Sequence, residues 1–239
     1  MPLLRLLAPI AVAIAFLLSG CAAGPEAPKR IGIIGLDTSH VVAFTTVFNK
    51  GPKNPADAAK FAGFRVTAAF AQGSKDIPES TVHVPDYTAK LQAMGVQVYD
   101  SIEKLCADVD FVMLESNDGR VHLEQVLPVF RSGKPVFIDK PIAGSLADVI
   151  RIQEAAKQYG AIYFCSSSLR YAADTQAVAR GSIGKVKTAY TTSPASLEPH
   201  HPDLYWYGVH GCESLYTVMG LGCVSVKREK TPEGFIQVT

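Results

Sequence analysis

The chain has 239 residues, of which 48% are hydrophobic and 19% charged, and its formal net charge is +1 at pH 7. This length and apolar content allow a substantial core, and they exclude a disordered, collagen-like or coiled-coil protein. The near-neutral charge balance, without a cluster of lysine and arginine, argues against nucleic acid as the main partner. Five cysteines without a CxxC pair indicate neither a zinc knuckle nor a dense disulfide framework.

The N-terminus has the pattern of an export signal. After Arg5, residues 6–18 form an apolar run of 13 residues, too short to cross a bilayer as a helix, which needs about 20 residues. The run ends in Leu18-Ser19-Gly20-Cys21, which resembles a bacterial lipobox. An ordinary secretory signal, cleaved just after this cysteine, is the alternative.

The lipobox predicts that residues 1–24 are a lipoprotein signal with the start of a tether, and that residues 25–29 are a linker. Lipidation of Cys21 would anchor the protein to a bacterial membrane in the cell envelope, facing away from the cytoplasm. In an oxidising compartment Cys212 and Cys223 could form a disulfide, but their spacing does not show whether they meet.

From Arg30 onward, short apolar strands alternate with helical stretches. Strands are predicted at residues 31–34, 64–70, 96–99, 111–114, 135–138 and 161–165. Helices are predicted at residues 41–48, 87–94, 102–107, 121–132 and 146–159, with Ser101 and Ser145 as N-caps and Gly160 as the stop. This alternation predicts an α/β domain over residues 30–165 in which helices cover both faces of a doubly wound parallel sheet.

The pattern changes after Cys165. Helices are predicted at 171–180 and 209–219, strands at 185–193, 223–228 and 235–238, and an irregular segment rich in histidine and proline at 196–207. Residues 166–239 are therefore expected to form a second, smaller α+β domain, which is partial because the sequence stops within its last predicted strand.

Four segments, in this order, resemble the glucose–fructose oxidoreductase, inositol dehydrogenase and MocA family (Gfo/Idh/MocA): IGIIGLDTSH, FVMLESNDGRVHLEQ, GKPVFIDKPIAGS and YGVHGCESLY. The resemblance covers about residues 29–222. It implies a Rossmann-type domain that binds NAD or NADP, and a second domain that takes a sugar or polyol as substrate. Because members usually continue for about another hundred residues, it also implies a truncated or reduced second domain. In the family this domain often mediates oligomers, so a homo-oligomer is expected.

The turn after the first strand corresponds to the phosphate loop of such a domain, where glycines let backbone N–H groups approach a pyrophosphate. Gly35 matches the first glycine of the GxGxxG/A pattern, but Asp37 replaces the second and His40 the third. A carboxylate there would repel a diphosphate, so the hydroxyls of Thr38 and Ser39 are expected to substitute for the lost backbone contact. Alternatively, one of residues 37–39 only caps the following helix.

The end of the second strand holds the cofactor ribose in this fold, often through an acidic residue. No carboxylate follows this strand until Asp76. Ser74 and Lys75 would tolerate a 2′-phosphate, although an ordinary polar loop is equally consistent, and the choice between NAD and NADP stays open.

Asp139-Lys140-Pro141 matches the Glu-Lys-Pro motif of the family, which implies that Lys140 contacts the nicotinamide ribose and the substrate hydroxyl and assists proton transfer. The alternative is a surface lysine in a tight turn. His210 matches the catalytic histidine, since imidazole can take a hydroxyl proton while hydride leaves the carbon. The aspartate expected four residues earlier is Trp206, which together with Tyr205 could stack on a sugar ring.

Three further groups of polar residues follow strands or occupy the second domain. Glu115 and Asn117 are expected to line the nicotinamide pocket, and His122 is expected to be structural. The pair His200-His201 near Asp203 lacks a fixed third ligand, so no metal site is predicted.

Two functions remain open from the sequence. The first is an NAD(P)-dependent oxidoreductase that acts on a sugar, polyol or related hydroxyl compound, with Lys140 and His210 as catalytic residues. The second is a non-catalytic carbohydrate-binding lipoprotein that retains the scaffold without the cofactor.

Overall fold

The computed structural model of the protein describes residues 27–239. The predicted signal and the lipidation site at Cys21 lie outside the described residues. Within the described part of the chain, no helix combines the length and apolar character needed to cross a membrane.

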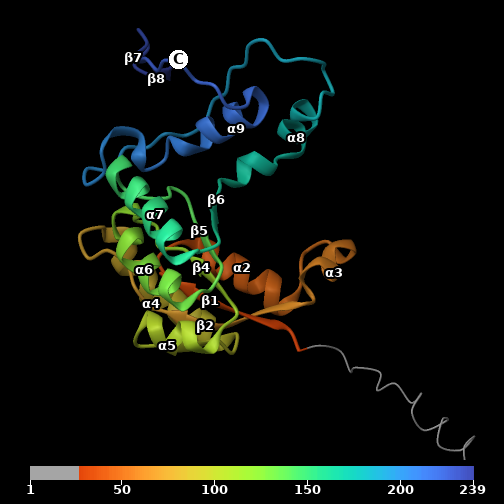
Figure 1. Ribbon diagram of the computed structural model, residues 1–239, viewed down its shortest axis with the longest axis vertical. Helices are drawn as coiled ribbons and strands as arrows, with labels where there is room; N and C mark the ends of the chain where they lie inside the picture. The colour runs from red at the N-terminus through yellow and green to blue at the C-terminus, as the bar shows by residue number, and fades with distance from the viewer. Residues whose placement is uncertain (1–26) are drawn as a thin grey trace, which may run out of the picture.

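Six parallel strands form a single sheet in the order β3-β2-β1-β4-β5-β6 (Figure 1). Chain order reverses between β1 and β4, which places a topological switch point at their carboxyl ends, where open α/β sheets bind ligands. The strands are β1 Lys29–Ile34, β2 Phe64–Phe70, β3 Gln97–Tyr99, β4 Phe111–Leu114, β5 Val136–Ile138 and β6 Tyr163–Cys165.

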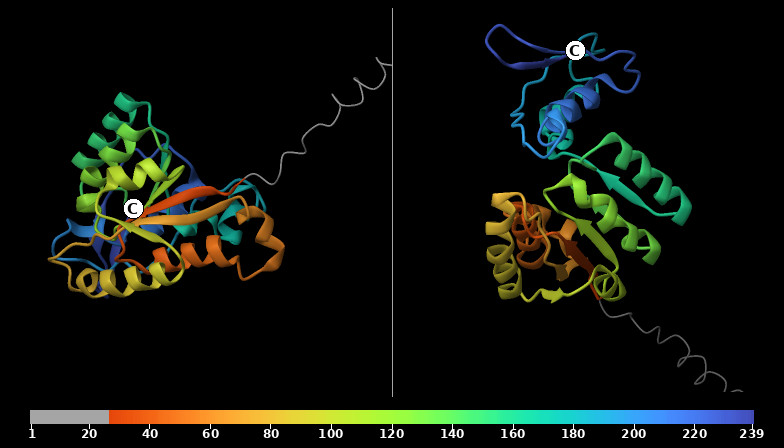
Figure 2. Two further views of the ribbon diagram at one scale, coloured as in Figure 1. Left: turned by 90° about the horizontal axis from the view of Figure 1, so that it is seen from below. Right: turned by 90° about the vertical axis from the view of Figure 1, so that its left-hand side faces the viewer.

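Helices cover both faces of this sheet. Figure 2 shows α6 and α7 on one side, and α2 and α4 on the other. The helices of this part are α2 Ser39–Lys50, α3 Ala58–Phe61, α4 Pro78–Ala93, α5 Ile102–Asp108, α6 His122–Ser132 and α7 Leu146–Tyr159. The predicted doubly wound parallel sheet is confirmed.

Strand β1 begins with two charged residues that are not buried, but from Ile31 to Ile34 it is apolar and buried on both faces. Ile33 packs with Val41 of α2 and Leu91 of α4, whereas Ile34 packs into the cluster that contains Leu105 of α5 and Phe130 of α6. Successive side chains of a strand point to opposite faces, so a continuous apolar run serves two cores at once.

The predicted helix boundaries agree well where a cap sets them. Ser101 Oγ accepts a hydrogen bond from Lys104 N at 3.2 Å, and Ser145 Oγ accepts one from Asp148 N at 3.1 Å. Gly160 ends α7 with a φ of 60°. By contrast, α4 begins nine residues before the predicted start, at Pro78, and continues through Pro85, a residue that usually breaks a helix interior.

The second part of the chain contains α8 Ala173–Ala179, α9 Val209–Met219 and an antiparallel hairpin of β7 Arg228–Lys230 and β8 Ile236–Val238. The predicted strand at 185–193 is wrong: this segment is irregular, and Tyr190 is 84% exposed. A strand needs a partner for its backbone groups, and no described segment pairs with this one. The strand predicted at 223–228 is wrong except for its last residue, where β7 begins.

Candidate active site

The turn after β1 fits tightly against the loop after β4. Gly35 has a φ of +83°, and a Cβ built on it would lie 2.5 Å from Ser116 N and 2.6 Å from Ser116 Cα. Its own N–H donates to Phe70 O at 3.1 Å. The contact between these two loops therefore already requires glycine at this position, whether or not a cofactor is bound.

Asp37 is buried between three elements. Its Oδ1 accepts a hydrogen bond from Asn117 N at 2.9 Å, and its Oδ2 accepts one from Ser80 Oγ at 2.8 Å. Burial raises the pKa of this carboxyl group, and the two hydrogen bonds oppose the rise. The Asp37 side chain thus connects the β1–α2 turn to the β4–α6 loop and to α4. Both of its carboxylate oxygens, which would repel a diphosphate, accept hydrogen bonds from the protein itself.

The start of α2 is capped by the next residue. Thr38 has extended backbone angles, and its Oγ1 accepts a hydrogen bond from His40 N at 3.4 Å. Thr38 thus takes the capping role that the sequence left open among residues 37–39. Ser39, the first residue of α2, is exposed at this helix N-terminus.

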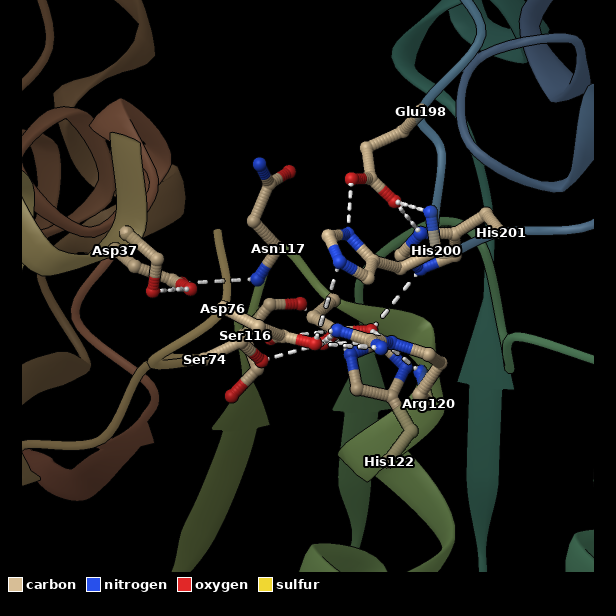
Figure 3. A network of polar contacts seen from close by, with 12 residues as sticks. Asp37, Ser74, Asp76, Ser116, Asn117, Arg120, His122, Glu198, His200 and His201 are labelled. Atoms are coloured by element: carbon tan, nitrogen blue, oxygen red, sulfur yellow. Dashed lines mark hydrogen bonds and ion pairs between the residues drawn. The ribbon is translucent and has the colours of Figure 1, made fainter. Parts of the chain in front are cut away.

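An ionic network occupies the carboxyl end of β2 (Figure 3). Ser74 donates a hydrogen bond to Asp118, which also accepts one from Arg120 Nη2 at 2.7 Å. Arg120 in turn makes two 2.9 Å hydrogen bonds to Asp76. Although burial opposes the effect, the hydrogen bonds from Arg120 and Ser74 lower the pKa of Asp118 to about 2. The Ser74 hydroxyl, predicted to hold a cofactor, is therefore engaged within the protein.

A segment from the second part of the chain covers this network. The His201 side chain is fully buried, with Nδ1 2.6 Å from Glu198 Oε2 and Nε2 at 3.0 Å from Asp118 Oδ1, a close approach without the alignment of a hydrogen bond. His200 Nδ1 lies 2.6 Å from Glu198 Oε1. The ring of Trp206 packs on that of His201, with their centres 4.7 Å apart. The end of β2, where a Rossmann sheet holds the ribose, is thus covered by side chains.

A cavity of about 1000 Å³ extends along one face of the sheet and reaches the carboxyl ends of β4 and β5. Its polar end contains both residues predicted to be catalytic, together with residues that the sequence did not suggest. Lining this end are His40, Asp139, Lys140, Ser166, Tyr171, Tyr207 and His210. Aromatic residues of α2 and of one sheet face line the remainder. Tyr205 and Trp206, predicted to contact a sugar, are not part of the lining.

Lys140 and His210 reach this cavity from different parts of the chain. Lys140 follows β5 and is buried, and its Nζ lies 5.3 Å from the centre of the Tyr207 ring. His210 lies in the first turn of α9, with Nδ1 2.7 Å from Ser167 Oγ. Burial, followed by the charge of Lys140, lowers the pKa of His210. Tyr207 lies in the turn before α9, and the centre of its ring is 4.8 Å from that of His210; its nearness to His210 in the YGVHGCESLY motif is the signal that could have identified it.

The residues after β4 take three different places. Glu115 is fully buried and is not part of the cavity lining, and neither of its carboxylate oxygens has a hydrogen-bond partner among residues 27–239. Burial and the nearby Asp139 raise its pKa well above the ordinary value. The backbone of Asn117 holds Asp37. His122 is buried with Nε2 2.7 Å from Ser116 O, as expected of a structural histidine.

His40, Glu115 and Asp139 lie together at this edge. His40 Nδ1 is 2.7 Å from Asp139 Oδ2 and 3.8 Å from Glu115 Oε2. Asp139 Oδ1 also accepts a hydrogen bond from Lys140 N at 2.8 Å. The sequence does not reveal this cluster, because its members are far apart along the chain. The one available signal is that each follows a strand of the same parallel sheet.

Comparisons with known proteins agree with this architecture. A 1,5-anhydro-D-fructose reductase from Ensifer adhaerens is 33% identical over 105 residues, or 42% of this chain and 32% of the reductase. An inositol 2-dehydrogenase from Gluconacetobacter diazotrophicus is 47% identical over 53 residues, or 22% of this chain and 15% of the dehydrogenase. The matches thus span a third or less of these relatives.

The fold also matches a solved structure from Sinorhizobium meliloti, a candidate myo-inositol dehydrogenase. The TM-score is 0.62 at 18% identity, covering 88% of this chain and 68% of the other. Residues 29–167, more than half of the chain, match the family model described as an oxidoreductase family with an NAD-binding Rossmann fold. The chain therefore belongs to the Gfo/Idh/MocA family of oxidoreductases.

Proposed function

We propose that the protein is an NAD(P)-dependent oxidoreductase that acts on a hydroxyl group of a sugar or polyol. The observation that carries this proposal is that Lys140 and His210 line one cavity at the carboxyl edge of the sheet. Acid–base chemistry requires both groups within reach of one substrate oxygen. The names of the two curated relatives, an anhydrofructose reductase and an inositol dehydrogenase, support the substrate class.

Two features of the chain fit a dinucleotide. The N-terminus of α2 is exposed at Ser39, and backbone N–H groups at a helix N-terminus favour a diphosphate. Beside it, the buried Ser116 Oγ has no hydrogen-bond partner within the part of the chain that the structure describes. The end of β2 fits less well, so we expect the adenosine half of the cofactor to compete with Glu198 and His201 for that position. When bound, the nicotinamide supplies or accepts the hydride.

The side chains of the cavity account for the proton. In the proposed reaction His210 donates its Nδ1–H to Ser167 Oγ, which leaves Nε2 free to take the proton of the substrate hydroxyl. The lowered pKa of His210 keeps the imidazole neutral, and therefore basic, at neutral pH. Lys140 binds the same oxygen and stabilises the negative charge that develops on it. Tyr207 and Tyr171 offer aromatic faces to the apolar side of a sugar ring.

The test is cofactor binding and turnover by the purified protein. NADH and NADPH binding are measured by calorimetry, and a panel of polyols and sugars is assayed at saturating cofactor. Replacing Lys140 or His210 by alanine should each lower kcat about 100- to 10,000-fold, the usual value of acid–base catalysis, with a smaller change in KM. Lys104→Ala, which removes an exposed lysine outside the cavity, should leave kcat unchanged.

The alternative predicts a different result. If the protein binds sugars but neither dinucleotide, it is a carbohydrate-binding protein on an oxidoreductase scaffold. Turnover that survives both alanine substitutions would contradict the roles given to Lys140 and His210.

A further inference from the structure

We propose that His40, Glu115 and Asp139 bind one divalent transition-metal ion at the carboxyl edge of the sheet. The proposal goes beyond the oxidoreductase function and does not depend on it. The three residues come from the first turn of α2 and from the residues that directly follow β4 and β5. Well-formed elements of the Rossmann domain therefore hold all three positions.

The geometry is close to that of a metal site. One nitrogen and two carboxylate oxygens lie within 4.8 Å of one another. Ligands about 2.1 Å from an ion lie roughly 3.0–3.6 Å apart in octahedral or tetrahedral arrangements. The 2.7 Å and 3.8 Å separations that His40 Nδ1 makes with the two carboxylates bracket this range. The carboxylate oxygens of Glu115 and Asp139 lie within 4.8 Å of each other, so small shifts of the three side chains would bring these atoms to an ion.

Glu115 supplies an independent argument. It is fully buried, yet neither of its oxygens has a hydrogen-bond partner among the described residues. An unpartnered buried carboxylate is costly, so such a group either holds a proton, pairs with a cation or coordinates a metal. A divalent ion held by His40 and Asp139 would satisfy the Glu115 carboxylate. Two carboxylates with a neutral imidazole would also balance the charge of the ion.

The composition and the surroundings of the site indicate the type of metal. An imidazole with two carboxylates suits zinc, manganese, iron or cobalt, whereas magnesium and calcium prefer oxygen ligands alone. His40 and Asp139 also line the cavity, whereas Glu115 is fully buried and is not part of its lining. Three protein ligands leave coordination positions free, as in catalytic zinc sites. We infer that these positions face the cavity that contains Lys140 and His210.

The competing explanation is a hydrogen-bonded cluster without metal, in which His40 Nδ1–H donates to Asp139. Calorimetric titration of the chelator-treated protein with ZnCl₂ separates the two, with bound zinc counted by mass spectrometry. We expect the wild type to bind one zinc per chain. Replacing His40 by alanine should weaken zinc binding by at least about 100-fold, since even changes outside the coordination sphere cost about 10- to 100-fold in metal affinity. His200→Ala, which alters an exposed histidine–carboxylate pair, should bind zinc like the wild type.

A second variant distinguishes loss of the metal site from loss of the fold. Glu115→Gln keeps the shape of the side chain but replaces the carboxylate that would bind the ion with an amide, so its thermal midpoint in chelator should be close to that of the wild type. Added ZnCl₂ should raise the wild-type midpoint and leave that of the variant unchanged. Equal zinc binding by the wild type and the His40 variant, or no binding by either, would overturn the proposal. So would a zinc-dependent rise in the Glu115→Gln midpoint as large as in the wild type.

Discussion

Replacing Gly35 by alanine measures how closely the β1–α2 turn approaches the loop after β4. The added Cβ would lie 2.5 Å from Ser116 N, inside the 3.0 Å that real Cβ atoms essentially never pass. The φ of +83° adds about 1–2 kcal/mol for a residue with a side chain, and the overlap adds about 1–3 kcal/mol. We therefore expect the free energy of unfolding to fall by about 2–5 kcal/mol in cofactor-free protein.

Gly95 provides the matched control. Its φ is +82°, but a Cβ there would meet nothing within 4 Å. Gly95→Ala should therefore cost only the backbone component, about 1–2 kcal/mol. In urea titrations with a slope of about 2 kcal/mol/M, the two midpoints should differ by about 0.5–1.5 M. Equal midpoints would show that the short distance between Gly35 and Ser116 does not require glycine. The remaining reason for glycine at this position would then be cofactor binding.

Three further outcomes are expected. Since the pKa of Asp118 is lowered from 3.8 to about 2, its carboxylate stabilises the fold by about 2 kcal/mol above pH 4, and this stabilisation is lost as the pH falls from about 4 to 2. Urea titrations across this pH range should show the loss in the wild type. In Asp118→Asn this pH dependence should be absent. Asp37→Gly should lower the free energy of unfolding by about 2–4 kcal/mol, because Asn117 N–H and Ser80 Oγ lose their acceptor, whereas unchanged stability in denaturant would show that the carboxylate is dispensable. Cys21→Ser should move the protein from the membrane to the soluble fraction and abolish the mass of a lipid, and fractionation identical to the wild type would rule out the anchor.

The elements of the Rossmann domain could be predicted because local patterns specify them. The strand Phe64–Phe70 and the helix Leu146–Tyr159 match their predicted bounds. In both, the signal lies in neighbouring residues: a short run rich in apolar and β-branched residues, or a serine cap at one end of the helix and a glycine at the other. The strand predicted at 185–193 failed because a strand is completed by a partner, which its own residues do not contain.

For the site, the sequence by itself was enough to predict which residues could take part in catalysis. Lys140 and His210 were predicted from motifs alone, and both line the same cavity. Only the tertiary structure decided what surrounds each group. It turned Asp37 toward Asn117 N and Ser80, and it engaged Ser74 with Asp118.

The cluster of His40, Glu115 and Asp139 shows the same division most clearly. Each residue is separated from the next by more than 20 positions, and no local pattern connects them. They meet because parallel strands end at one edge, so that residues after β4 and β5 come beside the first turn of α2. Sequence specifies the strands, but the pairing of strands in space brings their ends, and the charges on those ends, together.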